Sequence, residues 1–137
     1  MTLQQLDHLV LTVADIDLTC QFYATVLGVC VVRFQTTSGE ERVALRIGNS
    51  SQKINLHLAA QPFQPAARSP QPGSADLCFI TPTPLDAVVA HLTTLNISII
   101  DGPVQRTGTL GPILSIYVRD PDGNLIEVAN QMNADSQ

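Results

Sequence analysis

Tryptophan is absent from this 137-residue chain, and aromatic residues make up only 4% of it. Charged residues are also sparse, at 14%, and the longest apolar run, 26–32, is far too short to span a bilayer. The seven Lys and Arg residues are scattered through a chain of net charge −5, so no basic face for nucleic acid is expected. Neither nucleic acid nor a membrane is therefore an expected partner.

Cysteine is scarce as well, with Cys20, Cys30 and Cys78 making an odd count. None has a partner in a CxxC motif, and all three stand among apolar residues, which favours buried, reduced thiols over disulfides. The N-terminus lacks the basic residues and apolar core of a signal peptide. We therefore expect a cytoplasmic protein.

Apolar residues, at 45%, are plentiful enough for the core of one globular domain over residues 1–137. Their spacing predicts a first module over about 5–60 with the order strand, helix, strand, strand, strand. The strands are expected at 6–13, 29–34, 42–47 and 54–59, and the helix from the capping Asp15 to about residue 27.

A connector with four prolines in fourteen residues, 61–74, is predicted to be extended and semi-rigid. After it the pattern restarts in a second module over about 75–131. Its strands are expected at 76–81, 97–100, 113–119 and 125–130, and its helix at 84–95. The duplicated order predicts an α+β fold of tandem βαβββ modules.

A predicted turn at 120–124 directly precedes the last strand. Pro121 and Gly123 suit a tight turn, and although Asp120 and Asp122 resemble a fragment of a calcium loop, their spacing favours turn chemistry. In the strand that follows, Glu127 stands among apolar residues, where a carboxylate is costly to bury unless a cation meets it.

Four side chains combine into a candidate metal site, because each module carries one on its first strand and one on its last. They are His8, His57, Asp76 and Glu127. Alternation along the strands makes all four inward-facing if the sheets curl round a cavity. Imidazole and carboxylate ligands together suit a divalent ion, and zinc, nickel, iron, manganese and cobalt are all compatible.

The same residues carry a family resemblance. The motifs Leu-Asp-His8-Leu-Val-Leu-Thr-Val, Asn-Leu-His57 and Arg-Asp-Pro-Asp-Gly-Asn-Leu-Ile-Glu127-Val resemble the glyoxalase/bleomycin resistance/dioxygenase group, the vicinal oxygen chelate (VOC) superfamily. Gly-Ser-Ala-Asp76-Leu-Cys-Phe-Ile-Thr and the segment 102–112 are similar to the glyoxalase domain-containing protein five branch. The resemblance spans about residues 5–130.

This resemblance implies paired βαβββ modules that form an incomplete barrel around a metal site. It also implies a homodimer, in some members with modules exchanged between chains. His8 and Glu127 match the superfamily's usual ligands. Glyoxalase I enzymes generally have glutamate where His57 stands, and often histidine or glutamine where Asp76 stands, so Asp76 is either a fourth ligand, a group behind the ligands, or no ligand.

Three further residues are candidates for substrate binding. Arg106 lies in the glycine-rich segment 102–112, which we expect to be a mobile loop beside the pocket, where its guanidinium would bind an anionic group. Tyr117 and Asn55 point inward in the same alternation.

The expected function is that of a glyoxalase I-like lyase or isomerase. Its divalent ion would polarise two adjacent substrate oxygens, and Glu127 would bind the ion and act as a general base. Two alternatives remain open. His8, His57 and Glu127 also satisfy the ligand inventory of a non-haem iron(II) dioxygenase, and a metal-free drug-binding or resistance protein would use the same fold without the metal.

Overall fold

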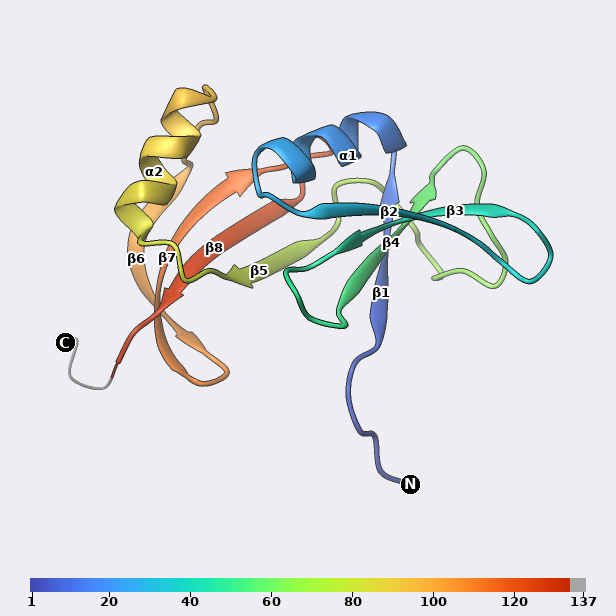
Figure 1. Cartoon of the computed structure of the whole chain (residues 1–137), viewed down its shortest axis with the longest axis horizontal. Coiled ribbons are helices and arrows are strands. Elements are labelled where there is room, and N and C mark those ends of the chain that lie inside the picture. The colour runs from blue at the N-terminus through green and yellow to red at the C-terminus, as the bar shows by residue number, and fades with distance from the viewer. Residues whose placement is uncertain (134–137) are drawn as a thin grey trace. The chain divides into compact units, whose positions relative to one another are not determined.

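The computed structural model describes residues 1–133, which divide into two compact units, Met1–Gly73 and a second unit that begins at Ser74. Each unit is one βαβββ module with a single four-stranded sheet (Figure 1). The strand orders are β1-β4-β3-β2 and β5-β8-β7-β6. In both sheets the first strand of the module lies at the edge and pairs in parallel with the last strand. The predicted α+β fold of tandem modules is confirmed.

The first unit contains β1 (His8–Val13), α1 (Ile16–Thr25), β2 (Cys30–Gln35), β3 (Glu41–Arg46) and β4 (Lys53–Leu58). Asp15 caps α1 as predicted, because its side chain accepts a 2.9 Å hydrogen bond from the backbone N–H of Leu18. Gly28, at φ +67°, allows the chain to turn back into β2.

One face of the first sheet forms the core beneath α1. Its alternate side chains are buried with Cys20 and Tyr23 of the helix, and they are Leu11, Val13, Val43, Leu45, Ile54 and Leu56. The intervening side chains occupy the other face of the sheet. This second face is called the open face of the first unit.

The second unit contains β5 (Asp76–Ile80), α2 (Leu85–Thr94), β6 (Asp101–Gly108), β7 (Gly111–Arg119) and β8 (Leu125–Gln131). Helix α2 packs on its sheet next to β7 (Figure 1). Ile116, Val118 and Ile126 are fully buried, whereas the side chains that alternate with them form the open face of the second unit.

The third strand of the second unit differs from its prediction. Residues 97–100 were predicted to be a strand but form none, and the segment 102–112, predicted to be a loop, lies mostly in two strands. Instead β6 and β7 form a hairpin whose strands close at the pair Gly108 and Gly111. The prediction failed because Gly102 and Pro103 suggest a break, whereas a shift of register between Asp101 and Val104 takes Pro103 into the strand.

The turn before β8 has the predicted chemistry. Asp120 Oδ1 accepts 3.0 Å hydrogen bonds from the backbone N–H groups of Asp122 and Asn124. The buried side chain of Asn124 donates to Asp120 Oδ2 at 2.8 Å and accepts from the N–H of Ala75 at 2.9 Å. The turn therefore ties the start of β8 to the start of β5, and this fixes the position of Glu127.

Among residues 1–133, neither helix is long and apolar enough to cross a membrane.

Candidate functional site

Glu127 lies at the centre of the open face of the second unit. The strand registers place it directly beside Cys78 of β5 and Tyr117 of β7. Because opposed residues in a sheet share a face, Asp76, Ser115 and Arg106 lie on the same side. Three predicted site residues of this unit, Arg106, Tyr117 and Glu127, are thus brought together, with Asp76 on the same face.

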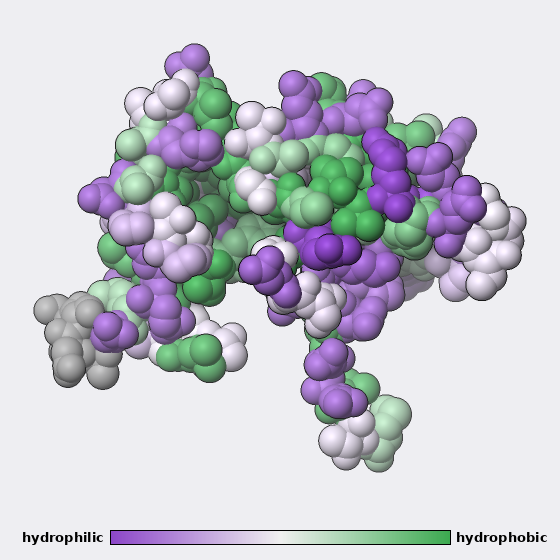
Figure 2. All heavy atoms as spheres, viewed as in Figure 1, coloured by the Kyte–Doolittle hydropathy of each residue, from purple (hydrophilic) through white to green (hydrophobic). Residues whose placement is uncertain are grey.

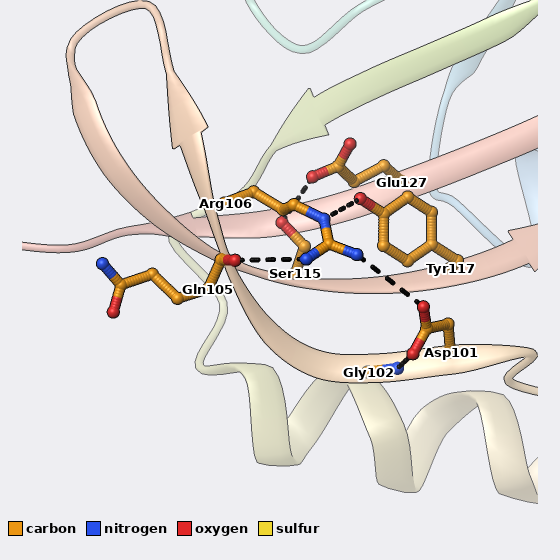
Figure 3. Close-up of polar contacts among 7 residues, drawn as sticks. All are labelled: Asp101, Gly102, Gln105, Arg106, Ser115, Tyr117 and Glu127. Atoms are coloured by element: carbon orange, nitrogen blue, oxygen red, sulfur yellow. Dashed lines mark hydrogen bonds and ion pairs between the residues drawn. The ribbon is translucent and has the colours of Figure 1, made fainter.

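Ser115 holds the carboxylate of Glu127. Its hydroxyl donates a 2.5 Å hydrogen bond to Glu127 Oε2, and the serine itself is fully buried (Figure 3). A hydrogen bond of this kind fixes the position of the carboxylate. Ser115 was not among the residues predicted from the sequence, although a lone hydroxyl within the apolar strand Ile-Leu-Ser115-Ile-Tyr, in alternation with Tyr117, was a usable signal.

Arg106 lies over Tyr117 rather than in a loop. Its Nε donates to the Tyr117 hydroxyl at 3.0 Å, and its Nη2 lies 3.8 Å from Asp101 Oδ2 (Figure 3). The hydrogen bond to Tyr117 raises the pKa of Arg106, and the charges of Asp101 and Glu127 add to this effect. The guanidinium is therefore a fixed cation between two acidic side chains, and it retains N–H donors for a ligand.

These side chains line an open depression of about 450 Å³, which we call the polar groove. Its lining consists mainly of charged and polar groups, namely Asp76, Asp101, Arg106, Tyr117, Arg119 and Glu127. The volume falls within the range of small-molecule sites, about 300–1,000 Å³.

Cys78 stands beside Glu127 without being a reactive thiol. Partial desolvation by the surrounding residues, together with the neighbouring Glu127, raises the pKa of Cys78 to about 11, so the group stays protonated at neutral pH. The three cysteines are free, as expected, but the expectation that all are buried is wrong. Cys20 is buried, whereas Cys30 and Cys78 are exposed because they fall on open sheet faces.

The open face of the first unit carries the two predicted imidazoles. The parallel register of β1 and β4 puts His8 beside Lys53 and His57 beside Thr12, so both histidines share this face with Asn55. Within the described residues, the buried Oδ1 of Asn55 has no hydrogen-bond partner. Arg42, Arg46 and Lys53 lie on the same face, so three of the seven basic residues are not scattered as the sequence suggested.

His8 is oriented by its neighbour in the chain. Its Nδ1 lies 2.7 Å from Asp7 Oδ2, and this contact lowers the pKa of Asp7. A carboxylate on Nδ1 leaves Nε2 as the outward nitrogen, which is the arrangement found behind metal-binding histidines.

His57 is held by an aromatic and cationic cluster. Its ring meets Phe63 edge to face with centroids 5.0 Å apart, and Arg42 lies 3.5 Å above the Phe63 ring. Burial lowers the pKa of His57, and the charges of Arg42 and His8 lower it further. The imidazole is therefore neutral at neutral pH, which is the form that binds a metal ion.

The four predicted metal ligands are divided between the units, the imidazoles of His8 and His57 in the first and the carboxylates of Asp76 and Glu127 in the second. Within residues 1–133, no three His, Cys, Asp or Glu side chains gather closely enough to hold a metal ion. The donors nevertheless fit a divalent ion chemically, because His57 is neutral, His8 has an orienting carboxylate, and Glu127 has one oxygen held by Ser115.

Two βαβββ modules with parallel first and last strands define the glyoxalase-type fold. A family model described as the Glyoxalase/Bleomycin resistance protein/Dioxygenase superfamily matches residues 5–128. The chain belongs to this superfamily, the VOC superfamily of the sequence resemblance.

Relatives extend the match over nearly the whole chain. The chain is 54% identical to virulence protein STM3117 of Salmonella typhimurium over 94% of its own length and 85% of that protein's length. The crystal structure of STM3117 matches with a TM-score of 0.87 over 96% of this chain and 100% of that one. Glyoxalase domain-containing protein RDO1 of Mycosarcoma maydis is 50% identical over 98% of this chain and 72% of its own length.

A more distant structure supports the fold alone. The crystal structure of lactoylglutathione lyase from Agrobacterium tumefaciens matches with a TM-score of 0.69 at 22% identity, over 99% of this chain and 100% of that one.

Proposed function

We propose that the chain is a divalent-metal-dependent enzyme of the glyoxalase I-like type, a lyase or isomerase acting on a small molecule with two adjacent oxygens. The observation that carries this proposal is the polar groove, in which the Ser115-bound carboxylate of Glu127 lies beside the fixed cation of Arg106. A carboxylate, a cation and a phenol in one small-molecule groove make up a general base and groups that orient a substrate.

His8, His57 and Glu127 would hold the ion, with Asp76 as a fourth candidate. Two imidazoles and one or two carboxylates leave coordination positions open on a five- or six-coordinate ion, so zinc, nickel, iron, manganese and cobalt all remain compatible. When bound, the ion would supply Lewis-acid polarisation of two adjacent substrate oxygens.

Glu127 is the proton-transfer group in this proposal. Ser115 holds Oε2, so Oε1 would bind the ion. Once it has left the ion, Oε1 would take a proton from the substrate carbon next to a carbonyl and later return it. The neighbouring Cys78 remains protonated, so it neither competes as a nucleophile nor adds a second negative charge.

Arg106 and Tyr117 orient the substrate. Their mutual 3.0 Å hydrogen bond restrains both side chains at the groove, which reduces the loss of rotamer freedom when a substrate binds. Asn55 is proposed as a further substrate contact, because its buried Oδ1 has no partner within residues 1–133.

The oligomeric state and the cellular location belong to the same proposal. We propose a homodimer, with exchange of modules between chains as one form of it, and a cytoplasmic location, which the free thiols of all three cysteines suit. Sedimentation of the purified chain measures its oligomeric state.

The decisive experiment combines metal analysis with activity. Purified protein is expected to bind about one divalent ion per chain and, when loaded with zinc, nickel or manganese, to isomerise the adduct of methylglyoxal and glutathione or a related α-hydroxycarbonyl compound. His8→Ala and Glu127→Gln should each abolish both properties, whereas His91→Ala on α2 should retain them. A chain that binds no ion, and whose ligand binding a chelator leaves unchanged, would favour the drug-binding alternative.

The dioxygenase alternative is distinguished by the same preparation. Two imidazoles and one carboxylate satisfy the ligand inventory of non-haem iron enzymes. Oxygen consumption that requires iron(II) and a catechol, without isomerase activity, would replace the lyase or isomerase assignment.

A further inference from the structure

A second depression lies under the β6–β7 hairpin, directly next to the polar groove. It has a volume of about 710 Å³, and we call it the hairpin groove. Its walls include apolar side chains of β5, β7 and the hairpin tip, and it shares two residues with the polar groove. The residues that matter here are Cys78, Ile80, Leu110 and Ile113, with Arg106 and Glu127 shared.

The apolar walls of the hairpin groove are accessible. Ile80 at the end of β5 is 56% exposed, and Leu110 at the hairpin tip is 84% exposed. Figure 2 shows apolar surface at this tip, below the sheet of the second unit. Exposed large apolar side chains that rim a depression mark binding sites more often than isolated ones do.

The absence of a side chain at Gly108 leaves room for Ile113 in the hairpin groove. A Cβ atom at this position would come within 2.9 Å of Ile113 Cγ2 and 3.1 Å of the Gly111 carbonyl oxygen. Glycine therefore allows the two strands of the hairpin to approach without a side chain that would displace Ile113.

We infer that the substrate carries an apolar chain, which lies in the hairpin groove while its polar head lies in the polar groove. This inference rests on the proposed function, since it identifies the substrate class of the same site. Glu127 and Arg106 stand where the two grooves meet, so a single molecule that contacts both residues extends into both depressions.

The charges at the junction favour a polar head without a net negative charge. Arg106 already lies 3.8 Å from Asp101 and is influenced by the charge of Glu127. A hydroxyl or carbonyl oxygen takes up its remaining N–H groups without placing a further anion beside two carboxylates. The inferred class is therefore an acyl or alkyl compound whose head carries two adjacent oxygens.

Straight-chain hydroxamic acids are suitable probes, because each presents two adjacent oxygens on a chain of chosen length. The series acetohydroxamic, butyrohydroxamic, hexanohydroxamic and octanohydroxamic acid is titrated into the full chain by calorimetry. Each added CH₂ that enters the hairpin groove is expected to raise the affinity about threefold to fourfold. An affinity that does not change with chain length would overturn the inference.

Variants of the groove wall test its location. Ile80→Ser and Leu110→Ser, both at exposed positions where folding is retained, should flatten the dependence of affinity on chain length. Leu18→Ser in α1 is the matched control, since Leu18 is 54% exposed and lies in the first unit. If affinity rises equally with each added CH₂ in all three variants and in the parent protein, the apolar part of the probe binds elsewhere and the inference is wrong.

Two further measurements separate this inference from the proposed function. Titrations with bound zinc and after chelation test the head group. If removal of zinc leaves the affinity for the probes unchanged, the metal-dependent function is wrong. An affinity that still rises with chain length supports the hairpin groove in either case. Sedimentation of the same variants tests whether a second copy occupies the groove. If Leu110→Ser changes the oligomeric state but not the slope, the groove is a contact between chains and the inference is wrong.

Discussion

The hydroxyl of Ser115 donates a 2.5 Å hydrogen bond to Oε2 of Glu127, from a fully buried position on the neighbouring strand β7. The two residues are not directly opposed, since Ser115 pairs with Ala129 and Glu127 with Tyr117. The bond therefore runs diagonally across the sheet and fixes one carboxylate oxygen while the carboxylate still lines both grooves.

Ser115→Ala is expected to weaken metal binding by about tenfold, because groups behind a metal ligand contribute about 10–100-fold to affinity. Competition against a chelating dye measures the change. Ser98→Ala, at an exposed position before β6, should leave the affinity unchanged. Equal affinities for Ser115→Ala and the parent chain would show that the hydroxyl does not position Glu127 for the ion.

Asp7→Asn is expected to reduce metal affinity by about tenfold as well. The carboxylate lies 2.7 Å from His8 Nδ1, and an amide in its place orients the ring less firmly and makes Nε2 less basic. The same dye competition measures the effect, and Asp86→Asn on α2 is the control. If the Asp7→Asn chain binds the ion as tightly as the parent, the contact has no role in metal binding.

The pKa of His57 is expected to rise when Arg42 is replaced by glutamine. Burial is the main cause of the lowered value and Arg42 the second, so Arg42→Gln should return the pKa only part of the way to its ordinary value. Titration of the imidazole C–H signals by NMR measures it. An unchanged pKa would mean that the charge of Arg42 does not reach the ring.

The lowered pKa of His57 also has a consequence for stability. The unfolded chain takes up a proton at a higher pH than the folded chain does, so the free energy of unfolding should fall as the pH drops below roughly 6.5 toward the folded-state pKa. Urea denaturation at a series of pH values should show a weaker fall for His57→Gln, which has no proton to take up. If the free energy of unfolding changes with pH in the same way for both proteins, the lowered pKa of His57 does not cause the loss of stability.

Gly102→Ala is expected to destabilise the second unit severely. Gly102 has φ +93°, and a Cβ there would collide with the Ser115 carbonyl oxygen and come within 2.9 Å of Ile116 Cα. Gly39→Ala is the matched control, because Gly39 has φ +82° and no atom within 4 Å of the added Cβ. The control should lose about 1–3 kcal/mol from backbone strain alone, and Gly102→Ala more, in urea denaturation. Equal losses would show that the backbone of β6 moves aside.

Much of the fold follows from local rules and could be predicted. The cap at Asp15, the turn closed by Asp120 and Asn124, and the parallel pairing of β1 with β4 and β5 with β8 agree with the duplicated pattern. These features depend on side chains that interact within a few residues of one another, or on a repeat that is visible along the chain.

The third strand of the second unit could not be predicted in the same way. Residues 97–100 include three isoleucines, which favour a strand, yet pairing with β7 begins only where the N–H of Ile100 donates to the carbonyl of Tyr117. A strand exists only where a neighbour supplies backbone partners, and alternation alone does not identify that neighbour.

The sequence by itself determined the module order, the membership of the superfamily and the chemical types at His8, His57 and Glu127, because these depend on residue identity and spacing. Only the tertiary structure decided that Ser115 holds Glu127, that Arg106 belongs to a strand over Tyr117, and that the hairpin bounds a groove. The reason is physical: strand pairing joins residues that are distant along the chain, and the sheet register then selects which of them share a face.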